Sequence, residues 1–90
     1  MSKRLRVEVT QEDIVKGNPG FAQSCPIARA IHRALPESAT VEVSSIIKVV
    51  EKTGGWRVFY PTKRALLFMG TFDKREAVAP TTFYFREANA

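Results

Sequence analysis

The sequence predicts an α+β domain, a two-layer sandwich in which a mainly antiparallel four-stranded sheet carries two helices on one face. Apolar and polar residues alternate at residues 4–9, 56–60 and 81–86, as in half-buried strands. Apolar side chains recur with a helical period at residues 26–35 and 62–72. The resulting β-α-β-β-α-β order favours a ferredoxin-like arrangement, with an antiparallel sheet of different strand order as the alternative.

Size and composition fit one packed domain over residues 1–90. The apolar share of 44% is enough for a core and too high for a disordered chain. The single cysteine excludes an internal disulfide and a zinc site built on several cysteines. No apolar run follows the basic N-terminus, and no segment approaches the length of a membrane span. We therefore expect a soluble cytoplasmic protein with no membrane partner.

The first strand is expected at residues 4–9, and a short helical turn follows it. Thr10 is a candidate N-cap for that turn, and Asp13 stands three residues on, near the capping-box position but one methylene shorter than the preferred Glu. The turn should end at Gly17, ahead of an Asn-Pro-Gly bend. The residues expected on the outward side of the strand are Arg4, Arg6 and Glu8.

The central helix begins at Cys25-Pro26, because proline is well suited to the first turn of a helix. It should end at Leu35, since Pro36 disfavours helical geometry at the residue before it. Apolar residues form one stripe along this helix, which predicts that it packs on the sheet. The residues expected on its solvated face are Arg29, His32 and Arg33.

Residues 39–51 are rich in β-branched side chains and predict one long strand. The alternation slips around Ser44 and Ser45, which a bulge or burial of both faces would explain. Residues 53–55 then predict a hairpin turn into a return strand at residues 56–60. The face of the return strand expected to join the core carries Trp56, Val58 and Tyr60, and the opposite face carries Arg57 and Phe59.

A second helix is expected after Pro61, with Thr62 as its N-cap. It is followed by a polar connector and by a last strand at residues 81–86. In that strand Tyr84 points away from the core. The apolar stripe of the helix consists of Ala65, Phe68, Met69 and Phe72, and the inward residues of the strand are Phe83 and Phe85.

No pattern in the sequence predicts catalysis. Cys25 and His32 are seven residues apart, or roughly 10 Å along a helix, which is too far for a direct hydrogen bond. A small buried thiol is the favoured interpretation of Cys25. No ligand spacing predicts a metal site, and no carboxylate pair predicts acid–base chemistry. We therefore expect no catalytic residue, no metal, no cofactor and no enzymatic activity.

The net charge of +5 makes nucleic acid or an acidic protein surface a plausible partner, although an ordinarily solvated basic domain is an equally good interpretation. Residues 52–60 loosely resemble the basic-glycine-aromatic strand of an RNA-recognition motif. Arg57 and Phe59 would then share the exposed sheet face with Tyr84. The first strand offers no aromatic residue there, and the alternative is that Phe59 packs at an edge.

Two helical surfaces are further candidates for a partner. The central helix presents a basic face, and arginine is common among the residues that dominate protein–protein interfaces. At the start of the second helix, two cations oppose the helix dipole, a local cost that can mark a binding surface. Together with the sheet, these surfaces give the candidate partner-binding residues Arg29, His32, Arg33, Arg57, Phe59, Lys63, Arg64 and Tyr84.

The segment Val-Thr-Gln-Glu-Asp-Ile at residues 9–14, followed by Cys-Pro-Ile-Ala at residues 25–28, resembles a group of small proteins encoded by bacteriophages and prophages. The resemblance extends to Tyr60-Pro61 and to the closing aromatic strand. It implies a phage or mobile-element origin, without an established activity. Small phage proteins often bind and block host proteins, including defence systems such as CRISPR.

Three function hypotheses follow. The first is a small non-enzymatic phage-type protein that binds a host protein or protein–nucleic-acid complex in the bacterial cytoplasm, as an anti-CRISPR-like inhibitor would. The second is a single-stranded nucleic-acid-binding module that uses Arg57, Phe59 and Tyr84. A cysteine-based enzyme is a distant third.

Overall fold

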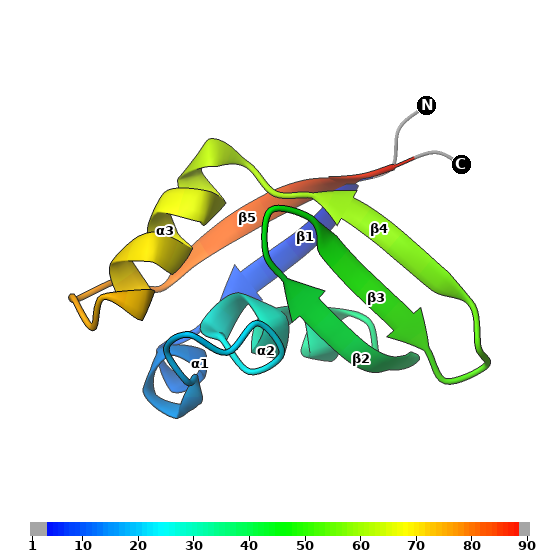
Figure 1. Cartoon of the computed structure of the whole chain (residues 1–90), viewed down its shortest axis with the longest axis horizontal. Helices are drawn as coiled ribbons and strands as arrows, with labels where there is room; N and C mark the ends of the chain where they lie inside the picture. Colours follow the sequence, from blue (N-terminus) through cyan, green and yellow to red (C-terminus); the bar gives the residue numbers. More distant parts are fainter. Residues whose placement is uncertain (1–3, 89–90) are drawn as a thin grey trace.

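A computed structural model of the protein describes residues 4–88 and has the expected α+β class (Figure 1). The elements are, in chain order, β1 (Arg4–Val9), α1 (Gln11–Lys16), α2 (Pro26–Ala34), β2 (Ser38–Val43), β3 (Ile47–Glu51), β4 (Trp56–Tyr60), α3 (Lys63–Asp73) and β5 (Thr81–Glu87). None of the described helices is both long and apolar enough to cross a membrane.

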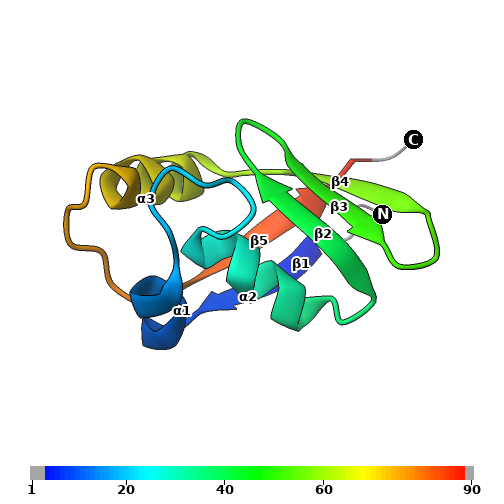
Figure 2. The same ribbon diagram turned by 60° about the horizontal axis from the view of Figure 1, so that its bottom comes forward.

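The five strands form one antiparallel sheet in the order β1-β5-β4-β3-β2. Strands β2 to β5 therefore lie side by side in chain order, and β1 is added beyond β5. Figure 1 shows β2, β3 and β4 running at a steep angle to β1 and β5, so the sheet is strongly twisted. Helix α2 contacts β1 and β2, the two edge strands, and lies on the concave side of the twisted sheet (Figure 2).

The side of the sheet that α2 covers is here called the inner face, and the core lies between this face and α2. Helix α2 contributes Ile27 and Ile31, both fully buried, and Ala65 of α3 lies in the same cluster. Phe68 of α3 meets the ring of Phe83 edge-on, with 5.6 Å between the ring centroids. Because α2 and α3 pack on the same side, the opposite side of the sheet keeps its side chains in solvent. The buried strand residues include Val7, Val41, Val49, Phe59, Phe83 and Phe85.

The helix boundaries confirm the predicted N-caps Thr10 and Thr62 and the predicted helix start at Cys25-Pro26. Thr10 and Asp13 form a complete capping box at α1, and Gly17 ends that helix. Cys25 caps α2, where its Sγ accepts a hydrogen bond from the amide of Ala28 at 3.4 Å. Thr62 caps α3 in the same way. Polar atoms at the helix starts thus specify these boundaries through purely local chemistry.

The predicted number of strands is wrong, because residues 39–51 form two strands instead of one. β2 ends at Val43 and β3 begins at Ile47, and between them the amide of Ser44 donates to the carbonyl of Ile46 at 3.1 Å. The slip in alternation therefore marks a tight turn. The Val43 amide, at the end of β2, donates to the carbonyl of Ala22 at 2.9 Å, which ties this edge strand to the loop before α2.

The helix count and the ferredoxin-like topology also need correction. The short turn predicted after β1 is a six-residue α-helix, so the described chain has three helices. A ferredoxin-like sheet has four strands with the first one inside. Here β1 is an edge strand beside β5, so the sheet follows the alternative, an antiparallel sheet of different strand order.

The predicted inward face of β4 is wrong as well. Phe59 is only 1% exposed, whereas Trp56 is 64% exposed. The register explains the reversal, because Phe59 lies opposite the buried Ile47 and Arg57 lies opposite the buried Val49. Arg57 is tolerated on this side because it donates to the carboxylate of Glu87 at 2.9 Å and 2.7 Å.

Two glycine-to-alanine substitutions should change stability in opposite directions. A Cβ on Gly17 would lie 2.8 Å from the carbonyl oxygen of Asp13 and 2.8 Å from Cδ of Pro26, so Gly17→Ala should destabilise the fold by about 1–3 kcal/mol. A Cβ on Gly70, inside α3, would meet nothing within 4 Å, so Gly70→Ala should stabilise it by about 0.5–1 kcal/mol. Urea midpoints measure both changes, and equal midpoints for the two variants would contradict this packing.

Candidate functional site

The side of the sheet opposite α2, here called the outer face, carries a group of aromatic and basic side chains. On β5, for example, Phe83 and Phe85 are buried while Tyr84 and Arg86 are exposed. The same alternation on β1, β3 and β4 exposes cations and rings on this side. The members of the outer face used below are Arg4, Arg6, Lys48, Trp56, Tyr60, Tyr84 and Arg86.

Three aromatic rings of the outer face are open to solvent. Trp56 is 64% exposed, Tyr84 is 52% exposed and Tyr60 is 46% exposed. Isolated exposed apolar residues are common on proteins, but a group of large rings on one surface is typical of binding sites. An aromatic side chain gains most from burial against a partner, because it brings a large apolar area with few rotatable bonds.

Cations lie against two of these rings. The guanidinium carbon of Arg86 is 5.8 Å from the ring centroid of Tyr60, and Nζ of Lys48 is 5.0 Å from that of Trp56. These distances are within the range of cation–π contact. The contacts orient the charged groups along the outer face beside the rings, so one ligand can meet both a flat apolar surface and a positive charge.

A hollow at one end of the outer face brings two cations and two phenols together. Arg4 lies directly opposite Arg86 in the β1–β5 register, and Arg86 lies opposite Tyr60 in the β4–β5 register. Like charges at opposed positions of a sheet destabilise it slightly, unless an anion lies between them. The hollow has a volume of about 410 Å³, and none of the described residues that line it is acidic; these are Arg4, Tyr60, Pro61, Thr62, Tyr84 and Arg86.

The structure places Tyr84 on the outer face as predicted but removes Phe59 from it. Phe59 lies in the core and cannot stack on a ligand while the fold is intact. Arg57 points to the same inner side, where it pairs with Glu87 and lies 3.6 Å from a carboxylate oxygen of Glu37. The hydrogen bond to Glu87 raises the pKa of Arg57. The predicted stacking platform of Arg57, Phe59 and Tyr84 is therefore wrong in two of its three members.

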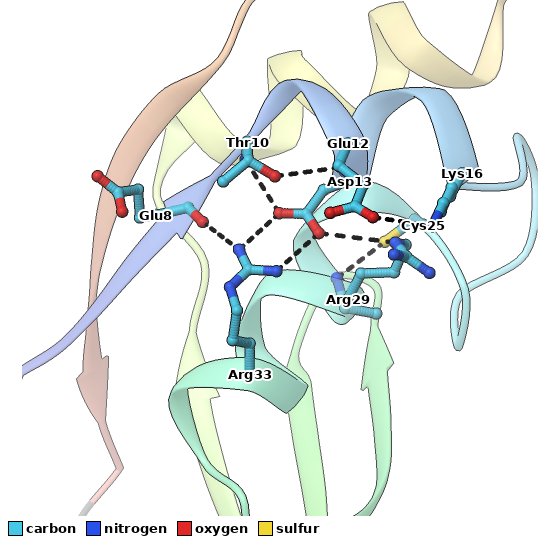
Figure 3. A network of polar contacts seen from close by, with 9 residues as sticks. Glu8, Thr10, Glu12, Asp13, Lys16, Cys25, Arg29 and Arg33 are labelled. Atoms are coloured by element: carbon cyan, nitrogen blue, oxygen red, sulfur yellow. Dashed lines mark hydrogen bonds and ion pairs between the residues drawn. The ribbon is translucent and has the colours of Figure 1, made fainter.

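The basic face predicted on α2 is partly engaged inside the protein (Figure 3). Arg33 donates to both carboxylate oxygens of Asp13, at 2.9 Å and 2.7 Å, and to the carbonyl of Glu8 at 2.7 Å. Nε of Arg29 lies 3.6 Å from the same carboxylate. Arg33 thus ties α2 to α1 and β1, and about half of its side chain remains exposed to solvent.

Asp13 is the buried centre of this network, with 0% exposure. Burial raises the pKa of Asp13, but the hydrogen bonds from Arg33 and from the Thr10 amide outweigh that effect and hold its pKa below the ordinary value. The carboxylate is therefore ionised at neutral pH. Its partner Arg33 has a raised pKa, with the hydrogen bond to Asp13 as the main cause.

Cys25 and His32 are engaged separately, at opposite ends of α2. Burial raises the pKa of the Cys25 thiol, so the thiol is protonated and poorly nucleophilic. Nδ1 of His32 lies 2.9 Å from Oγ of Ser38, whose hydroxyl donates to the carbonyl of Leu35. Over residues 4–88, no group of three or more histidine, cysteine, aspartate or glutamate side chains is arranged to hold a metal ion.

At the start of α3, Lys63 is exposed and Arg64 is bound to β5. Arg64 donates to the carbonyl of Thr82 at 3.1 Å and to Oγ1 of Thr81 at 2.6 Å, and its guanidinium lies 4.6 Å from the ring centroid of Phe83. These contacts give Arg64 a role in attaching the helix to the sheet. Lys63 remains available for contact with a partner.

Sequence reasoning missed several residues of the outer face. Trp56 and Tyr60 were assigned to the core, because the alternation of β4 does not reveal which side is inward. Arg86 alternates with Phe85 in the sequence, but only the strand order and register bring it next to Arg4 and Tyr60. No protein-family model, curated protein or solved structure significantly matches this chain, so the geometry alone carries the assignment of the site.

The Asp13 network predicts a specific dependence of stability on pH. Because the pKa of Asp13 in the folded state lies below its ordinary value of 3.8, its contribution is complete above about pH 4 and is lost as the pH falls through the folded-state value. Asp13→Ala should lower the free energy of unfolding at pH 7 by about 2–4 kcal/mol, through loss of the cap and of the ion pair. Asp13→Asn should also flatten the acid side of the stability curve.

The matched control is Glu12→Gln, which removes a neighbouring carboxylate of α1. Glu12 pairs with Lys16 at 2.8 Å in an exposed position, so its loss should change stability far less than the loss of Asp13. Urea unfolding from pH 7 down to about pH 2.5 measures both variants. An acid slope in Asp13→Asn as steep as in the unchanged protein would contradict the proposed role of the carboxylate.

Proposed function

We propose that this protein is a non-enzymatic binding protein that engages a negatively charged macromolecule of a bacterial host through its outer face. The observation that carries the proposal is the cluster of exposed rings with cations beside them on one side of the sheet. Aromatic residues and arginine are the residue types that contribute most to binding energy at interfaces. The host in this proposal rests on the resemblance to phage-encoded proteins.

The charge distribution supports the outer face over the other candidate surfaces. The carboxylates of the outer face lie on its two edge strands, where Glu8 is 3.7 Å from Arg6 and Glu42 is opposite Lys48 in the register. On α2, by contrast, Arg33 is paired with Asp13, so a partner that binds Arg33 would compete with this internal ion pair. A negatively charged partner therefore meets the least competition at the outer face.

The state of the potential nucleophile supports a role in binding. An enzyme built on Cys25 would need a thiolate and a nearby base. The thiol instead is buried, has a raised pKa and accepts a hydrogen bond from the backbone. A separate depression beside Cys25 is lined by Phe21 and Met69, and most of the side chains around it are neutral.

Capture of a partner from a bacterial lysate tests the proposal. Tagged protein should retain a defined macromolecule, and the double variant Tyr84→Ala with Arg86→Gln should retain at least tenfold less, since loss of a dominant interface residue costs about 2 kcal/mol and about 1.4 kcal/mol is tenfold. The matched control is Arg75→Gln, which removes one exposed positive charge in the α3–β5 connection, at the far end of β5 from Arg86.

A second control tests a competing surface. Leu67 on α3 is 72% exposed and would contribute if the helix were the working surface. Leu67→Ala should leave capture unchanged. If Leu67→Ala or Arg75→Gln lowers capture while the outer-face variant does not, the proposed surface is wrong.

A further inference from the structure

We infer that the partner of the outer face is single-stranded nucleic acid, with a backbone phosphate held between Arg4 and Arg86 and with bases stacked on Tyr60, Tyr84 and Trp56. The inference rests on the proposed function and names the chemical class of the partner. Two features of the outer face carry it, namely the paired arginines at the hollow and the row of exposed rings beside them.

The hollow has the chemistry of a phosphate site. Arg4 and Arg86 are directly opposed across β1 and β5, so their Cβ atoms are about 5 Å apart and both guanidiniums can reach one anion. Each guanidinium presents a fork of donors that fits two phosphate oxygens. Thr62 also lines the hollow, and because its Oγ1 accepts the amide hydrogen bond of Ala65, the hydroxyl hydrogen is left to be donated elsewhere.

The rings are placed to take successive bases. Tyr60 and Tyr84 both line the hollow, and they are diagonal neighbours across β4 and β5, because Tyr60 lies opposite Arg86. Diagonal neighbours in a sheet are about 7–8 Å apart, within reach of aromatic side chains. Trp56 extends the row, because it lies four residues from Tyr60 on the same strand, or about 13 Å away. Sheets that bind single strands use such rings as sequence-tolerant stacking surfaces.

Exposed rings favour a single strand over the other polyanions. A duplex offers phosphates but keeps its base faces stacked inside, so the three rings would contribute nothing to binding. A peptide of acidic residues, such as polyglutamate, offers carboxylates without flat partners for the rings. Of these three polyanions, the single strand matches both the charge of the arginines and the π surfaces next to them.

Fluorescence anisotropy with a labelled oligothymidylate of about 16 nucleotides tests the inference, with the same sequence as a duplex and with polyglutamate as competitors. The single strand should bind most tightly at low salt. Tyr60→Ala and Tyr84→Ala should each weaken binding about 5- to 100-fold, while Tyr84→Phe, which keeps the ring, should bind as the unchanged protein does. Arg86→Gln should reduce the slope of log K against log salt by about 0.7, and Arg75→Gln should not.

The outcomes separate this inference from the proposed function. If the oligonucleotide does not bind at low salt although the outer-face variants still abolish capture of a protein from lysate, the inference is overturned and the proposed function stands. If the outer-face variants affect neither measurement, both are overturned. Equal affinity for single strand and duplex, with no effect of Tyr60→Ala or Tyr84→Ala, would overturn the stacking of bases.

Discussion

The carboxylate of Asp13 holds together the three elements that set the shape of this protein. It caps α1 through Thr10, binds the guanidinium of Arg33 on α2, and through that guanidinium is linked to the carbonyl of Glu8 on β1. The connection fixes α2 beside β1, so the helix can lie across the concave inner face of the twisted sheet and also contact β2. A buried charge costs free energy unless it is paired and hydrogen-bonded. The carboxylate of Asp13 is paired with Arg33 of α2 and also accepts a hydrogen bond from the Thr10 amide.

The position of α2 determines where the basic excess of the chain is available. Acidic groups on the inner side take up the cations near them, Asp13 taking Arg33 and Glu87 taking Arg57. The cations at the far side of the sheet, such as Arg86 and Lys48, instead lie against aromatic rings. Four cations, Arg4, Arg6, Lys48 and Arg86, thus share the surface that also carries the exposed rings. The exposed rings with cations beside them on one side of the sheet are the physical basis of the proposed binding surface.

Local chemistry made much of the fold predictable, and long-range pairing did not. Thr10, Pro26 and Thr62 specify helix starts because caps depend only on residues within one turn. The side of β4 that faces inward depends on the register with β3, which places Phe59 opposite Ile47. Both alternating sets of β4 contain aromatic residues, so periodicity alone could not choose between them. The prediction of the site residues was wrong for the same reason. When the inward side of β4 is reversed, Phe59 moves into the core and Tyr60 moves to the exposed face.

The placement of α2 across both edge strands also restricts how the sheet can associate. An open strand edge is a template for further strands, and it favours both aggregation and the recruitment of extended peptides. In this protein the Glu8 carbonyl on one edge already accepts from Arg33, and the Val43 amide on the other already donates to Ala22. These two contacts disfavour main-chain augmentation at one position on each margin, which favours recognition through side chains.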